Sequence, residues 1–80
     1  MSKIADWARE VPDGIGAAYP QRMSWPDEIA TAFFLMDEKG YSRAEARKLI
    51  VEKEQLNKVQ AKSFMWSFNR FWRLREQSKN

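Results

Sequence analysis

The chain of 80 residues contains no cysteine and no histidine. Without cysteine, neither a disulfide nor a thiolate metal site can stabilise the fold, and without histidine the other usual zinc ligand is also missing. A nucleophilic serine would have no histidine base, and the three glycines form no phosphate-binding loop. We therefore expect a non-enzymatic protein with no catalytic residues, no metal and no cofactor.

Long apolar runs are also missing. No stretch approaches the roughly 18 apolar residues of a membrane span, and the opening "MSKIADWARE" has charges where a signal peptide needs apolar residues. Together with the absence of cysteine, these features predict a cytoplasmic protein with no membrane span. The length predicts a single helical domain over residues 1–80.

The apolar periodicity predicts an all-α fold, a small three-helix bundle with helices at about 24–39, 43–54 and 58–76 and a polar tail at 77–80. Ser24 is the expected N-cap of the first helix, with Pro26 in its first turn and Gly40 at its exit. Capping-box pairs then begin the next two helices: Ser42 with Glu45, and Asn57 with Gln60. One unbroken helix over 43–76 is an open alternative.

The inward residues of the bundle follow from the same spacing. In the first helix the expected inward row is Ile29, Phe33 and Met36, with Ala32 and Phe34 beside it. In the second helix the expected inward face consists of Ala46, Leu49 and Ile50. Before residue 24 the spacing of Ile4, Trp7, Ala8 and Val11 predicts a short helix. The turn "VPDG" should end it. An extended arm then carries Ile15, Tyr19 and Met23 across the bundle, so residues 1–23 form an N-terminal helix and arm packed on the core.

Charge is unevenly distributed along the chain. Residues 1–57 contain 8 Lys/Arg and 10 Asp/Glu, a net −2, whereas residues 58–80 contain 6 Lys/Arg and one acid, a net +5. A basic end of this kind is typical of proteins that meet an anionic partner, although cations near a helix C-terminus also interact favourably with the helix dipole. The last helix is therefore the place to look for a binding surface.

Two surfaces separate when the last helix is plotted on a helical wheel. A stripe about 120° wide has the usual width of a core-facing surface and contains Ala61, Phe64, Met65, Phe68, Phe71 and Trp72. The outward surface combines cations with one indole, and its candidate binding residues are Lys58, Lys62, Trp66, Arg70 and Arg73. Arg75 falls on the apolar arc but so near the helix end that its head can reach water, and it is a further candidate. Burial of Trp66 under the N-terminal arm, or against a second copy of the chain, is the competing interpretation.

The favoured hypothesis is a regulatory or accessory protein that binds nucleic acid through this outward surface, because Lys and Arg contact phosphates and an indole stacks on bases. A helix-turn-helix is a weaker form of it, since the connection "EKEQLN" has no glycine and contains Glu52 and Glu54. The alternative is a protein-interaction module: an inhibitor or adaptor of a larger acidic protein, as among phage or plasmid accessory factors, or a homodimer. Binding to a membrane surface ranks last.

The segment "LMDEKGYSRAEARKLI" locally resembles ubiquitin-associated domains, which have a glycine–aromatic–serine loop followed by an "EA" helix. Here "GYS" and Glu45-Ala46 match that pattern, and "LNKVQAKSFMW" is similar in outline to the third helix of those domains. The resemblance covers about 40 residues; it implies three-helix geometry and a protein-docking loop at Gly40 and Tyr41. This chain departs from the pattern by extra residues before Gly40 and a longer stretch before Asn57.

Overall fold

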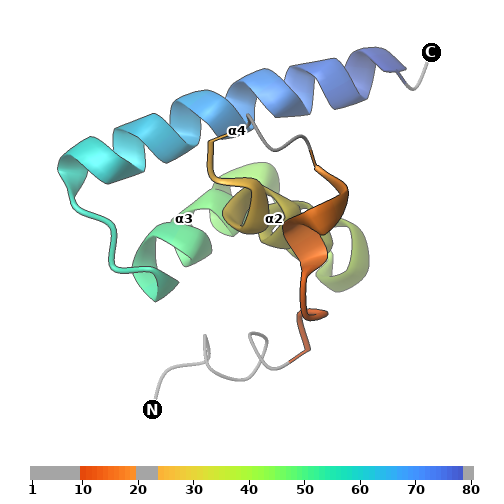
Figure 1. The fold of residues 1–80 in the computed structure, drawn as a ribbon, viewed down its shortest axis with the longest axis horizontal. Helices are drawn as coiled ribbons and strands as arrows, with labels where there is room; N and C mark the ends of the chain where they lie inside the picture. Colours follow the sequence, from red (N-terminus) through yellow and green to blue (C-terminus); the bar gives the residue numbers. More distant parts are fainter. Residues whose placement is uncertain (1–9, 20–23, 79–80) are drawn as a thin grey trace.

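The computed structural model describes residues 10–19 and 24–78. Its elements are a 3₁₀ turn, η1 (Ile15–Ala18), and three α-helices, α2 (Pro26–Lys39), α3 (Arg43–Lys53) and α4 (Lys58–Ser78). Helix α4 lies along one side of the molecule, across α2 and α3, and residues 10–19 cover another part of α2 (Figure 1). The predicted all-α three-helix bundle is therefore confirmed, with α4 two residues longer than expected.

The start of α2 differs from the prediction. Its N-cap is Trp25 in the left-handed region (φ 62°), and no side chain caps the helix, so Ser24 as the cap is wrong. The Trp25 ring meets Phe64 edge-on with ring centroids 6.2 Å apart, and its indole N–H donates to Ser63 Oγ at 3.1 Å. Because the indole packs on α4, tertiary contacts hold the backbone in a conformation that is costly for a residue with a Cβ.

Helix α2 ends with Gly40 as its C-cap, as the sequence predicts. Gly40 lies in the left-handed region (φ 77°), and the backbone amides of Gly40 and Tyr41 both donate to the carbonyl of Leu35. This arrangement gives an acceptor to the two amides that follow the last turn.

Helix α3 ends at Lys53 and α4 begins at Lys58, so residues 43–76 do not form a single helix. Ser42 and Glu45 form the predicted capping box of α3. After α3 ends, Gln55 takes a left-handed conformation (φ 53°). Asn57 and Gln60 then exchange backbone-to-side-chain hydrogen bonds of 3.0 and 2.8 Å, so a second capping box begins α4.

The core is centred on α2, which is buried around most of its circumference because α3, α4 and η1 each cover part of it. Ile29 and Phe33 are buried as predicted, whereas Phe34 and Met36 are only half-buried. Leu35 was not predicted but is fully buried. A prediction based on one inward row misses buried residues, such as Leu35, when neighbouring elements cover a helix from several sides.

Helix α4 closes the core with phenylalanine. Phe64 and Phe68 are fully buried, and Phe33 of α2 lies against Phe68 with ring centroids 5.4 Å apart. The other residues of the predicted stripe pack at its edges and are half-buried: Ala61, Met65, Phe71 and Trp72. The inward surface of α4 is therefore the one that its periodicity predicts.

Residues 10–19 pack on α2 through η1 and Tyr19. The segment predicted as an extended arm forms the 3₁₀ turn, and the Gly16 amide donates to Asp27 Oδ1 at 3.1 Å. The Tyr19 ring lies 5.1 Å from that of Phe71. Burial raises the pKa of the Tyr19 hydroxyl, the charge of Arg75 lowers it, and Asp37 raises it further. The predicted N-terminal helix lies outside the described residues up to residue 9, and Met23 does as well, whereas Val11, the last residue of the predicted stripe, is not helical.

Candidate nucleic-acid interface

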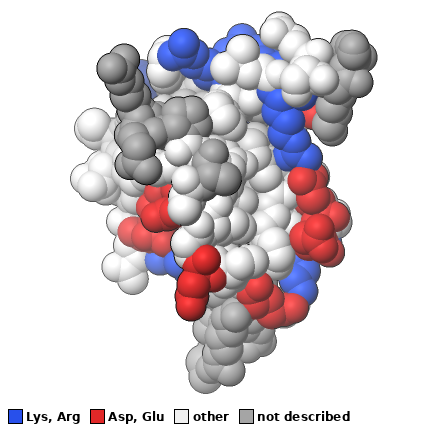
Figure 2. Space-filling view, turned by 45° about the vertical axis from the view of Figure 1, so that its right-hand side comes forward, with Lys and Arg blue, Asp and Glu red and all other residues white. Residues whose placement is uncertain are grey.

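The five candidate residues lie on α4, where its inward phenylalanines fix how the helix is rotated. We call Lys58, Lys62, Trp66, Arg70 and Arg73 the basic face, and all five side chains are exposed. Phe64 and Phe68 are drawn into the core, so residues half a turn away from them must point outward. Cations gather along the edge where α4 runs, whereas acidic groups lie over the other half of this view, interspersed with further cations (Figure 2).

Trp66 is the aromatic centre of the basic face. Its exposed fraction is 64%, so the described residues do not cover it. The Arg70 guanidinium lies 5.7 Å from the centroid of the Trp66 ring, within cation–π range. Trp25 and Trp72, by contrast, are half-buried against the core cluster. The indole of Trp66 therefore presents a ring face that a base or another flat group could contact.

The cations of the basic face are not neutralised by ion pairs with described residues. The ion pairs found in residues 10–19 and 24–78 join Lys39 to Glu10, Lys53 to Glu54, and Arg75 to Asp37. None of them involves Lys58, Lys62, Arg70 or Arg73. These side chains can direct their charge at an external anion without first breaking an ion pair of this kind.

Arg75, the further candidate, lies apart from the basic face, and its head pairs with Asp37. One guanidinium nitrogen donates to both Asp37 carboxylate oxygens at 2.6 Å. The guanidinium also lies 4.4 Å from the ring centroid of Phe33. The side chain therefore joins α4 to α2, and an external anion would have to compete with the Asp37 carboxylate for it.

A second cationic feature lies between α3 and α4, and sequence reasoning missed it. A hollow of about 270 Å³, which we call the arginine hollow, is lined by Arg43, Arg47, Asn69, Trp72 and Arg73. Arg43 and Arg47 share a face of α3, and the other three residues share a face of α4, since helix neighbours recur every three or four positions. That spacing was a signal, but only tertiary structure shows that these two faces meet.

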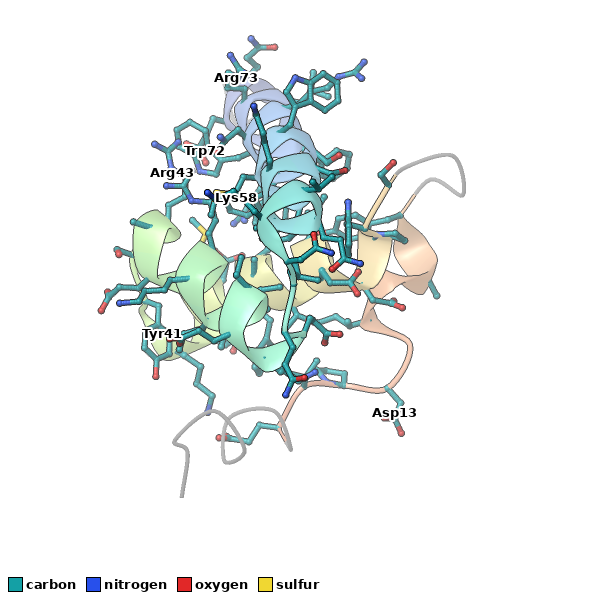
Figure 3. All side chains as sticks on the ribbon, turned by 90° about the vertical axis from the view of Figure 1, so that its left-hand side faces the viewer. Asp13, Tyr41, Arg43, Lys58, Trp72 and Arg73 are labelled. Carbon is teal, nitrogen blue, oxygen red and sulfur yellow. The ribbon has the colours of Figure 1, made fainter. Side chains whose placement is uncertain are left out.

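Stacking and hydrogen bonding hold the side chains of the arginine hollow. The guanidinium of Arg43 lies over the Trp72 ring, 3.9 Å from its centroid. Arg47 donates to Asn69 Oδ1 at 2.8 Å, and Arg73 Nε donates to the Asn69 carbonyl at 3.4 Å. Figure 3 shows Arg43 reaching from α3 to Trp72, with Arg73 on the same side of α4.

Comparison with known proteins adds no relative: no protein-family model, no curated protein and no solved structure matches the chain. Within residues 10–19 and 24–78, no three Cys, His, Asp or Glu side chains gather into a group that could hold a metal ion. No helix in that same part of the chain has the length and apolar character needed to cross a bilayer. A functional interpretation must therefore be based on the basic face and the arginine hollow.

Proposed function

We propose that the chain is a small non-enzymatic regulatory or accessory protein that binds nucleic acid through the basic face of α4. The observation that carries this proposal is the 64% exposure of Trp66 among exposed cations on the same helix. A tryptophan is usually well buried, and an exposed indole among cations is the combination that surfaces for single-stranded nucleic acid use.

Single-stranded nucleic acid is the form that this surface fits best. Lys58, Lys62, Arg70 and Arg73 would contact phosphates, while the Trp66 indole would stack on an unpaired base, which a duplex keeps inside its own stack. Stacking of one base is worth roughly 1–3 kcal/mol and tolerates any base. Four phosphate contacts predict a slope of roughly −3 when log affinity is plotted against log salt concentration.

Recognition of a base sequence by a helix-turn-helix is the weaker possibility. Glu52 and Glu54 are exposed next to the start of α4, where their charge would repel the phosphates beside the groove. The proposed binding is therefore led by phosphate and stacking contacts rather than by base edges.

Fluorescence anisotropy of a labelled single-stranded oligonucleotide, measured at low and moderate salt, tests the proposal. We expect Trp66→Ala to weaken binding about ten-fold or more, and Trp66→Phe to retain much of the affinity because a ring still stacks. Lys48→Gln provides the charge control, since Lys48 is exposed on α3 outside the basic face. Absence of binding by the unaltered chain at low salt would refute the proposal.

Docking on another protein is a second candidate, favoured by a specific observation. Val59 and Leu74 are exposed at 78% and 51%, and they lie about two helical turns before and after Trp66, so three apolar side chains share one side of α4. A helix laid in a groove, or a second copy of this chain, would cover such a row. A dimer in sedimentation that Trp66→Ala dissociates, with no oligonucleotide binding, would favour this candidate.

A further inference from the structure

The arginine hollow concentrates positive charge at a place that the basic face alone does not include. Three guanidinium groups line it, from Arg43, Arg47 and Arg73, and none of its lining residues is acidic. Its volume of about 270 Å³ exceeds the share of several water molecules, at roughly 30 Å³ each, so a tetrahedral oxyanion can enter.

The side chains in the arginine hollow are already oriented. The Arg43 guanidinium is held over the Trp72 ring, 3.9 Å from its centroid, and a guanidinium can donate two parallel hydrogen bonds to paired oxygens. Arg47 is half-buried and hydrogen-bonded to Asn69, and its buried Nε has no acceptor among the described residues. A guanidinium that is partly removed from water and lacks a carboxylate partner favours a nearby anion.

We infer that the arginine hollow is a phosphate-binding site that binds one phosphate of the nucleic-acid strand that lies along the basic face. This inference rests on the proposed function for its source of phosphate. Phosphate fits the site better than a carboxylate does, because its oxygens point in tetrahedral directions and can accept from guanidinium forks on both helices. Arg73 belongs to both the hollow and the basic face, so the strand's path continues from α4 onto α3 (Figure 3).

Arg43→Gln and Lys48→Gln form the matched test pair. Both remove one charge from α3, but Lys48 is exposed and lies outside the arginine hollow. In the anisotropy assay we expect Arg43→Gln to lower affinity about ten-fold and to reduce the salt slope by about 0.7–0.9, the effect of one lost phosphate contact. Lys48→Gln should change affinity by less than about two-fold, since Lys48 does not line the phosphate site.

Arg43→Lys keeps the charge but loses the planar fork, so it separates recognition from net charge. We expect it to lower affinity nearly as much as Arg43→Gln does. Circular dichroism checks that each variant is folded. If either Arg43 variant unfolds, Arg47→Lys provides the same comparison from within the hollow.

The outcomes distinguish this inference from the proposed function. Equal affinities for Arg43→Gln and Lys48→Gln, with a large loss for Trp66→Ala, would overturn the phosphate site and leave the basic face intact. If the unaltered chain binds no oligonucleotide, calorimetric titration with inorganic pyrophosphate tests the site by itself. Pyrophosphate binding that Arg43→Gln abolishes would support a phosphate site with another source of phosphate. Absence of pyrophosphate binding would overturn the site.

Discussion

A methyl group added at Gly16 tests whether residues 10–19 belong to the folded core. Gly16 is buried, and a Cβ built there would lie 2.2 Å from Asp27 Oδ1 and 2.8 Å from both Cα and N of Asp27. The carboxylate could rotate away, although it would then lose its hydrogen bond to the Gly16 amide. The backbone atoms at the start of α2 cannot rotate away, so η1 itself would have to move outward.

The cost follows from overpacking at a fixed backbone. Forcing an extra methyl into such a contact costs about 1–3 kcal/mol, whereas a chain of 80 residues has a total stability of about 4–12 kcal/mol. Each kilocalorie lowers the melting temperature of a domain of this size by about 4–8 °C. We expect Gly16→Ala to lower it by roughly 5–20 °C in thermal unfolding followed by circular dichroism.

Two companion variants identify the cause. Ala17 is exposed in the same turn, so Ala17→Ser should leave the melting temperature within about 2 °C. Adding Asp27→Ala to Gly16→Ala should not restore stability, because two of the three close contacts are to backbone atoms. An unchanged melting temperature for Gly16→Ala, or full recovery in the double variant, would refute this account of how η1 packs.

Three further predictions concern the left-handed residues, Tyr19 and the basic face. Gln55→Gly should raise the free energy of unfolding in urea by about 0.5–1 kcal/mol, since glycine adopts a positive φ readily, whereas Trp25→Gly should lower it by about 2 kcal/mol because the packed indole is lost. The pKa of Tyr19 is raised in the folded state, so its contribution to stability is fully present below about pH 10 and is lost as pH rises through the folded pKa; Tyr19→Phe should flatten this alkaline decline in urea titrations. Trp66→Ala should change the free energy of unfolding by less than about 0.5 kcal/mol, because the side chain is exposed, and a larger loss would mean that Trp66 is part of the core.

The candidate interface could be predicted from sequence only where one helix contains all of its residues. Lys58, Lys62, Trp66, Arg70 and Arg73 share a side of α4, and the phenylalanines opposite them decide which side faces out. The arginine hollow could not be found in this way. Arg43 and Trp72 are distant in sequence, and their stacking depends on how α3 lies against α4.

The sequence by itself determined where the helices begin and end wherever the signal is local. A capping box joins positions three residues apart, and the exit at Gly40 depends on that residue's own freedom at positive φ, so Ser42, Asn57 and Gly40 act as expected. Tertiary structure decided the rest: Trp25, whose indole packs on α4, is the N-cap residue of α2 instead of Ser24, and Arg75 pairs with Asp37 instead of facing solvent. These outcomes depend on contacts between separate helices, which the periodicity of a single helix does not contain.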